Sequence, residues 1–234
     1  MHGIAEAMDR NGYVLVPDIL PSEDIAELRT VLATADLARA KRGGMTYGAR
    51  NLLTLPEIRK AASANKLCAS LESVLGRSFH AVRGIFFDKT EGANWPVLWH
   101  QDLSLALRKR RDLPGWTGWS DKRGIPHAQA PAEILDKMVT VRIHPDDCPS
   151  ENGALRLIAG SHRRGRIPRE TIRSVIANEP VDIVAAARGD ALFMRPLILH
   201  ASSPAQKPVH RRVLHLEFAP ADLLPEELAW AEAI

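Results

Sequence analysis

Apolar residues recur at helical spacing in the first third of the chain. Ile25, Leu28 and Leu32 lie three and four positions apart, and a serine and two acidic residues precede them, as is usual where a helix begins. The spacing predicts a helix over 23–38. A shorter helix before it is expected to end at Gly12, since glycine commonly ends helices, and the run YVLVPDIL that follows is predicted to be a strand.

A capping box and a glycine-rich run complete this part of the chain. Thr54 and Glu57 match the capping box, which predicts one helix running to Leu75 and stopping at Gly76. The run KRGGMTYGARNLL, which precedes this helix, is predicted to be a loop. We therefore expect an N-terminal helical part over about 1–76.

Short apolar or alternating runs separated by turn residues dominate the rest of the chain, and this pattern is typical of strands. The candidates are FHAVRGIFFDK, VLWHQDLSL, MVTVRIH, ALRLI, VDIVA, ALFM, LILH and RVLHLEF. Because no helical crossovers alternate with them, they favour an antiparallel sandwich or barrel with helices packed outside. The sequence thus predicts a mainly β fold with flanking helices in a single domain, 1–234, with a barrel core at about 77–220 and a C-terminal helix at 222–233.

Residues 105–135 form the longest stretch without a clear strand or helix pattern. The stretch is rich in Arg, Trp, Gly and Pro, and an extended loop in a compact domain is usually functional or disordered. Tryptophans interleaved with arginines can stack nucleic-acid bases. We favour a lid that closes over a bound substrate.

Charge and composition narrow the class of partner. Lys and Arg total 31 against 28 Asp and Glu, and the basic residues are mostly scattered, which favours an anionic small molecule over nucleic acid. No run approaches the roughly 18 apolar residues of a membrane span, and no signal peptide is recognisable. Cys68 and Cys148 are expected to be reduced thiols. We expect a cytoplasmic protein with a small-molecule substrate and with no nucleic acid or membrane as partner; the oligomeric state stays open.

The stretch LWHQDLSLAL places two metal-capable side chains two positions apart. His100 and Asp102 would share one face of a strand, because side chains alternate along it. Two histidines and one carboxylate around an octahedral ion leave positions open for substrate and dioxygen, as in non-haem Fe(II) oxygenases. The pair alone is weak evidence. His200, which closes the strand candidate LILH, would supply the third ligand.

Arg211 lies eleven residues after His200, at the start of an alternating strand. A guanidinium binds a carboxylate through two parallel hydrogen bonds, so an arginine here fits a cosubstrate that carries a carboxylate. Arg212 would face the opposite side of the strand, so only one of the two can enter a barrel, and the spacing favours Arg211. His215 is expected on the same face as Arg211, either near the site or as a core histidine.

Four segments together resemble the phytanoyl-CoA dioxygenase family of Fe(II)/2-oxoglutarate-dependent oxygenases. They are WHQD, ENGALRLIAGSHRRG, RGDALFMRPLILHASS and HRRVLHLEFAP, and with the N-terminal helices the likeness spans nearly the whole chain. Ala159 stands where the family usually has proline, a departure that concerns turn stiffness. The resemblance implies a double-stranded β-helix, or jelly roll, which agrees with the strand pattern.

The resemblance also implies a set of site residues. His100, Asp102 and His200 match the iron ligands, Arg211 matches the arginine that binds the distal carboxylate of 2-oxoglutarate, and Ser202 matches a serine that assists it. Lys89 is a further cosubstrate contact or a solvent-facing residue at a strand end. The implied cofactors are Fe(II), 2-oxoglutarate and O2. The implied reaction is hydroxylation of a small organic molecule with release of succinate and CO2; the carboxylate ligand argues against halogenation, for which related enzymes carry a small residue there.

Four residues are candidate substrate contacts. Arg142 is unusual inside the strand MVTVRIH and would contact substrate or cosubstrate if it faces inward. Trp116 and His127 belong to the predicted lid. Arg50, in the predicted glycine-rich loop, would clamp an anionic substrate; a purely structural role is the alternative for each.

Two other functions fit the same pattern. A jelly-roll protein could keep a metal without turnover, as a sensor or binding module, and a cupin-type isomerase would need no 2-oxo acid, which would leave Arg211 without a role. The substrate does not follow from the sequence, because the family acts on acyl-CoA thioesters, amino acids, small natural products and phosphonates.

Overall fold

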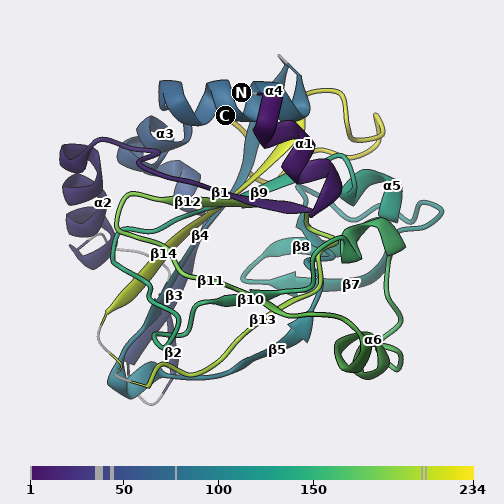
Figure 1. Cartoon of the computed structure of the whole chain (residues 1–234). Helices are drawn as coiled ribbons and strands as arrows, with labels where there is room; N and C mark the ends of the chain where they lie inside the picture. The colour runs from purple at the N-terminus through teal and green to yellow at the C-terminus, as the bar shows by residue number, and fades with distance from the viewer. Residues whose placement is uncertain (1, 35–38, 43–44, 77, 207, 209) are drawn as a thin grey trace.

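Two facing β-sheets enclose the interior of the molecule (Figure 1). The structure, a computed structural model, describes residues 2–34, 39–42, 45–76, 78–206, 208 and 210–234. Within this part of the chain the larger sheet has the strand order β1 (Tyr13–Val16), β12 (Ala191–Met194), β9 (Val139–Ile143), β14 (Arg211–Pro220), β4 (Phe79–Lys89), β3 (Met45–Arg50) and β2 (Arg39–Arg42). The smaller sheet has the order β11 (Asp182–Val184), β10 (Leu155–Leu157), β13 (His200–Ser202) and β5 (Val97–His100).

The strand pairs in both sheets are antiparallel, and the fold is a jelly roll. The predicted mainly β fold with flanking helices is confirmed. No helix in the described residues is both long enough and apolar enough to cross a membrane.

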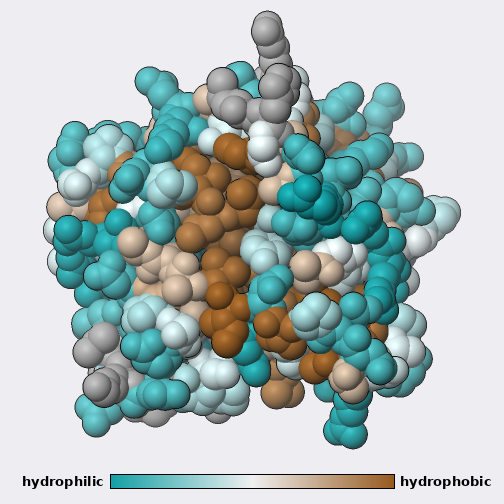
Figure 2. Space-filling view, in the orientation of Figure 1, coloured by the Kyte–Doolittle hydropathy of each residue, from teal (hydrophilic) through white to brown (hydrophobic). Residues whose placement is uncertain are grey.

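Four helices cover the outer face of the larger sheet: α1 (His2–Arg10), α2 (Ser22–Thr34), α3 (Pro56–Ala62) and α4 (Asn65–Leu75) (Figure 1). Ile25, Leu28 and Leu32 of α2 are buried, as their spacing predicts, and they belong to one apolar cluster with Leu214 and Phe218 of β14. Polar side chains surround an apolar band on the face shown in Figure 2. The main apolar core therefore lies outside the barrel, which leaves the inner face of β14 free to carry polar residues.

The described residues also form two short helices, α5 (Ala132–Leu135) and α6 (Ile172–Asn178). They include the 3-10 turns η1 (Leu52–Thr54), η2 (Glu91–Ala93) and η3 (Ser161–Arg164) as well. The predicted helix over 23–38 is described as far as Thr34, and its remaining residues lie outside the described part of the chain.

The glycine-rich run before α3 is not the predicted loop. Its described residues form β2 and β3, and β3 extends the larger sheet by pairing with β4. A Cβ on Gly48 would lie 2.8 Å from the carbonyl oxygen of Phe86, so glycine here permits a close approach between strands. The glycines were interpreted as turn residues, but Gly48 lies within a strand and allows close packing against the neighbouring strand.

The predicted helix from Thr54 to Leu75 is in fact two helices, α3 and α4. Thr54 does not cap α3; its hydroxyl donates to the carbonyl of Asn51 at 2.9 Å, and Leu55 occupies the N-cap. The chain is extended at Ala64, between the two helices. Gly76 ends α4 with a positive φ of 81°, as predicted.

Residues 105–135 are not a long loop. Three strands, β6 (Ser104–Ala106), β7 (Thr117–Lys122) and β8 (Ile125–Gln129), form a separate sheet in the order β6-β8-β7, and α5 follows them. The prediction of a long loop is therefore wrong, whereas a lid role for this segment stays a prediction.

The predicted C-terminal helix at 222–233 is absent: these residues form turns that pack against β6. Trp230 forms an isolated bridge with Leu107, and Arg108 donates to the carbonyl of Ala229 at 2.9 Å. Leu228 is buried in the same apolar cluster as Trp230. Tertiary pairing thus outweighs the local helical spacing.

Candidate metal centre

His100 and His200 lie side by side on neighbouring strands of the smaller sheet. His100 ends β5 and pairs directly with His200, the first residue of β13. Directly paired residues on antiparallel strands point to the same face. Both imidazoles therefore enter the interior of the barrel, with ring centroids 4.2 Å apart.

Asp102 lies just beyond β5, not within it as predicted. The strand ends at His100, and the amide of Asp102 donates to the carbonyl of Pro196 at 2.9 Å. The carboxylate nevertheless turns towards the two rings. Its Oδ1 lies 3.6 Å from His100 Nε2, and its Oδ2 lies 3.6 Å from His200 Nε2.

These three side chains fit a metal ion. One donor atom from each lies within 4.8 Å of the others, and ligands about 2.1 Å from one cation lie roughly 3–4 Å apart. His100 Nδ1 donates to the carbonyl of Leu98 at 2.8 Å, and His200 Nδ1 donates to that of Ile198 at 2.9 Å, so each Nε2 keeps its lone pair for a metal. Asp102 Oδ2 is buried without a hydrogen-bond partner, and a cation would satisfy it.

The charges of Asp102 and His200 are those of metal ligands. At His100, burial lowers the pKa, but the hydrogen bond and charge of Asp102 outweigh it and raise that pKa. Burial alone would raise the pKa of Asp102, but His200, His100 and His215 outweigh it and hold that pKa well below its usual range. Burial lowers the pKa of His200 to about 4, so its imidazole is neutral at pH 7. A neutral imidazole beside an ionised carboxylate is the form in which these groups bind metals.

A cavity of about 250 Å³ lies beside this cluster, between the two sheets. His215, predicted on the same face as Arg211, lines it too, as do four of the residues expected from the sequence to contact ligands: Lys89, Arg142, Ser202 and Arg211. Arg142 therefore faces inward. The structure brings seven of the ten predicted site residues to one cavity.

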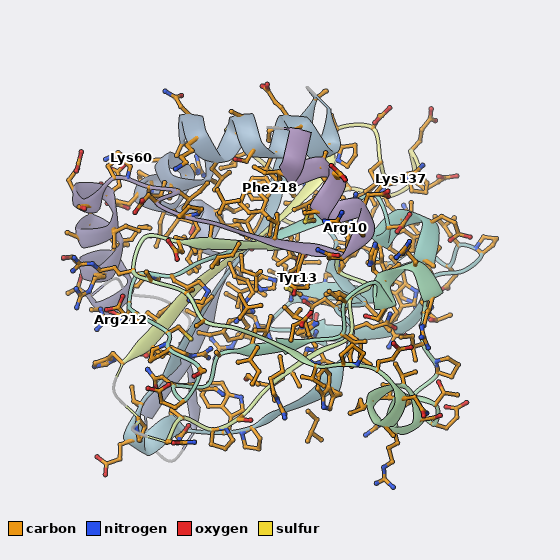
Figure 3. The ribbon with its side chains drawn as sticks, in the orientation of Figure 1. Arg10, Tyr13, Lys60, Lys137, Arg212 and Phe218 are labelled. Atoms are coloured by element: carbon orange, nitrogen blue, oxygen red, sulfur yellow. The ribbon has the colours of Figure 1, made fainter. Side chains whose placement is uncertain are left out.

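Arg211 and Lys89 reach the cavity from neighbouring strands of the larger sheet. Arg211 Nη1 donates to the carbonyl of Gly153 at 2.9 Å, while its Nε is buried without a partner. Lys89 Nζ donates to Ser202 Oγ at 3.0 Å. Arg212 faces the other way and forms an ion pair with Asp146 at 3.4 Å; Figure 3 labels Arg212 at the start of β14.

The cavity carries an excess of positive charge. Lys89, Arg142 and Arg211 line it, and Asp102 is the carboxylate among its lining residues. Burial, Arg211 and Arg142 lower the pKa of Lys89 to about 7, and burial lowers the pKa of Arg142 to about 10. A bound anion would favour the protonated forms of these groups.

Gly153 is a site residue that the sequence reasoning did not single out. Its carbonyl accepts from Arg211, and a Cβ on it would lie 2.9 Å from the carbonyl oxygen of Ser203 and 3.3 Å from Lys89 Nζ. Its φ of 70° also favours glycine. The signal was the glycine within ENGALRL, which was used only as part of the resemblance.

Gln101, between the two ligands, faces away from the cavity and fixes the segment from outside. Its Nε2 donates to the carbonyls of Gly165 and Leu197, at 2.8 and 2.6 Å, and its Oε1 accepts from the amide of Ile167 at 2.8 Å. These three bonds satisfy the side-chain amide. They hold the turn that carries His100 and Asp102.

Three predicted substrate contacts lie outside the cavity lining. Trp116 packs in the apolar cluster of Leu107 and Trp230. His127 is buried on β8, where its Nδ1 donates to the carbonyl of Ile125 at 2.9 Å. Arg50 ends β3 and is half-buried.

The family model of phytanoyl-CoA dioxygenase (PhyH) matches residues 8–213. The chain belongs to the phytanoyl-CoA dioxygenase family. The match begins in α1 and ends in β14, so it takes in the metal cluster and Arg211. No curated protein sequence matches the chain.

Three solved structures share the fold of this chain. HygX from Streptomyces hygroscopicus, with nickel, 2-oxoglutarate and hygromycin B bound, is 19% identical, with a TM-score of 0.67 over 95% of this chain and 88% of HygX. The epimerase SnoN, in complex with Fe3+, alpha ketoglutarate and nogalamycin RO, is 19% identical, with a TM-score of 0.68 over 94% and 83%. The carbocyclase SnoK from nogalamycin biosynthesis is 18% identical, with a TM-score of 0.71 over 94% and 84%.

Proposed function

We propose that this protein is an Fe(II)- and 2-oxoglutarate-dependent oxygenase that hydroxylates a small organic molecule. The observation that carries the proposal is the meeting of two imidazoles and a carboxylate at a cavity that also holds three cations. His100, Asp102 and His200 would hold the iron. When bound, iron supplies the chemistry with dioxygen that oxidises a substrate while 2-oxoglutarate becomes succinate and CO2.

The remaining cavity residues suit a dicarboxylate. The guanidinium of Arg211 has a buried Nε–H without a partner, which can donate to a carboxylate. Lys89 and Ser202, already hydrogen-bonded to each other, would contact the same carboxylate. A dianion would also balance the charge excess of the cavity.

Hydroxylation is the outcome we propose among the reactions of this fold. SnoN is described as an epimerase and SnoK as a carbocyclase, so related structures support several oxidations. Because Asp102 occupies the carboxylate ligand position, a halide cannot take that position on the metal. The substrate would reach the metal from the side where His100 and Asp102 are partly exposed, 40% and 29%.

The test is an anaerobic titration of 2-oxoglutarate into the Fe(II) protein, followed through the visible charge-transfer band. We expect the band in the parent protein and slow succinate formation when air is admitted. Arg211→Gln should weaken the affinity for 2-oxoglutarate by about 30-fold or more, because it removes one partner of a buried charged hydrogen bond.

Arg212→Gln is the matched control, because Arg212 lies next in sequence and faces outward. It should leave the titration unchanged. His200→Ala should abolish the band. Metal binding without succinate would favour a sensor or binding module instead, and an equal effect of both arginine variants would contradict the assignment of Arg211.

A further inference from the structure

Beyond the cavity, the inner face of β14 continues into a second group of buried polar side chains. Glu217 of β14 and Arg83 of β4 form an ion pair at 3.0 Å, and both are buried. Glu217 lies six residues after Arg211 on the same face, about 20 Å further along the strand. A five-carbon diacid held at Arg211 does not reach it, so these residues have another role.

A chain of hydrogen bonds joins this group to the cavity. Arg142 Nη1 donates to His215 Nδ1 at 3.2 Å, since a guanidinium only donates. The proton of His215 is then on Nε2, which lies 3.4 Å from Glu217 Oε1. Glu217 is thus held rigidly from two sides, by His215 and by Arg83.

Two buried oxygens in this group have no hydrogen-bond partner. They are Glu217 Oε2 and Thr140 Oγ1, and Glu217 and Thr140 are direct partners on neighbouring strands. Burial would raise the pKa of Glu217, but Arg83 and His215 outweigh it and lower that pKa, so the carboxylate is charged. A charged, buried acceptor without a donor is costly. A hydroxyl or amino group of a bound molecule could supply that donor.

Lys122 supplies a cation at the same end of the interior. Its Nζ donates to Ser104 Oγ at 3.5 Å, and the carbonyl of Ser104 accepts from Arg83 at 3.0 Å. Ser104 comes two residues after Asp102, so at most about 7 Å of chain separates it from the metal ligand. Among the described residues no carboxylate forms an ion pair with Lys122. Burial, Arg83 and Arg50 lower the pKa of Lys122, and they outweigh the opposing charge of Glu217.

Resting on the proposed oxygenase function, we propose that this polar strip, formed by Arg83, Ser104, Lys122, Thr140 and Glu217, recognises the substrate. The substrate is then a small polar molecule with an oxyanion, a carboxylate or a phosphate ester, that binds Lys122. It also carries a hydroxyl or amino group that donates to Glu217. Because Ser104 follows Asp102 by two residues, this polar strip begins close to the metal ligands, and we expect a compact molecule.

A competing location for the substrate is a cleft of about 740 Å³ beside β5, which also reaches His100. Leu98, Trp99 and Ile172 give it apolar walls, and Arg166 and Arg169 line it as well. It would suit a substrate with a large apolar part. The two locations therefore predict different classes of substrate.

The experiment measures succinate formation above background by the Fe(II)- and 2-oxoglutarate-loaded protein with four sets of probes. These are hydroxy and amino carboxylic acids, their phosphate esters, neutral polyols, and apolar alcohols and acyl chains. We expect stimulation within the first two sets only, and the set that stimulates tells whether the oxyanion is a carboxylate or a phosphate. Stimulation confined to polyols or apolar compounds, or none at all, would overturn the proposal.

Variants then assign the contacts. Lys122→Met should raise KM for the stimulating compound by about 10-fold or more, because a charged hydrogen bond is lost. Lys122→Arg should keep KM close to that of the parent protein. Glu217→Gln should reduce the preference for the hydroxylated compound over its deoxy analogue. Lys137→Met, at an exposed lysine labelled in Figure 3, is the control and should change nothing.

The charge-transfer titration is run on every variant. If the parent protein gives no band with 2-oxoglutarate, the proposed function itself fails, and the substrate proposal fails with it. If the band forms but Lys122→Met leaves KM unchanged, the substrate proposal alone is overturned. Lys122→Arg keeps the charge and Glu217→Gln keeps the shape of the side chain, which guards against misfolding of a single variant.

Discussion

Lys89 is the residue on which the charge of the cavity depends most. Its side chain is fully buried, and its ammonium donates to Ser202 Oγ and to the carbonyl of Ser203. Burial, Arg211 and Arg142 lower its pKa to about 7, so near neutral pH its charge depends on whether an anion is bound. A bound dicarboxylate favours the protonated form.

Binding of 2-oxoglutarate should therefore weaken as pH rises. Below pH 7 Lys89 is already protonated, while above it binding must take up a proton, so the dissociation constant should rise by about 10-fold per pH unit. Anaerobic titrations between pH 6.5 and 8.5 measure this. Lys89→Met should bind more weakly but lose this pH dependence, and a flat profile for the parent protein would refute the prediction.

At the scale of single residues, the sequence reveals most of the candidate site. His100, His200 and Arg211, chosen from ligand spacing and from an arginine at a strand start, line one cavity in the structure, and their roles stay predictions. Trp116 was chosen because it lies in the predicted lid, and it packs in an apolar cluster. Glu217 escaped notice because nothing in RVLHLEF distinguishes an inward carboxylate from a surface one.

The sheet formed by β6, β8 and β7 is the element that the sequence concealed. Its hairpin turn, Arg123-Gly124, has φ of 61° and 81°, as in the two-residue turns that favour glycine. The signal was therefore present, but the arginines and tryptophans around it suggested a loop. The segment is ordered by contacts with the C-terminal residues, which no local pattern reveals.

Trp230→Ala should test the packing of the C-terminal residues against this sheet. Trp230 is 8% exposed within the cluster of Leu107 and Trp116, and loss of such a side chain costs about 3–4 kcal/mol in the free energy of unfolding. Urea unfolding measures the loss. Leu98→Ala, at a side chain that is 75% exposed, is the control and should stay within about 0.5 kcal/mol of the parent. A similar loss for both variants would argue against the observed packing.

At the scale of the whole molecule, the apolar core and the functional interior lie on opposite faces of the larger sheet. Leu214 and Leu216 of β14 face the helices, whereas Arg211, His215 and Glu217 face the barrel. The barrel interior thus contains three neighbouring cations and several buried oxygens without a partner, besides its paired groups. Without ligands it contributes little to stability.

Ligand binding should consequently stabilise the fold. With Ni(II) and 2-oxoglutarate at about 100 times their dissociation constants, each should add about 2.7 kcal/mol. For a chain of this size each addition raises Tm by roughly 5–10 °C. Thermal unfolding measures the rise in Tm. Arg211→Gln should retain the rise caused by Ni(II) and lose most of the rise caused by 2-oxoglutarate. An unchanged Tm with both ligands would contradict the assigned site.

The hydrogen bonds of Gln101 have a consequence for protein engineering. A carboxylate at this position would face the carbonyl oxygens of Gly165 and Leu197, and asparagine would be too short to span the same acceptors. The residue between the histidine and the aspartate is therefore tied to a turn more than sixty positions away. Anyone who grafts this ligand pair onto another scaffold must transplant the 165–167 turn along with it.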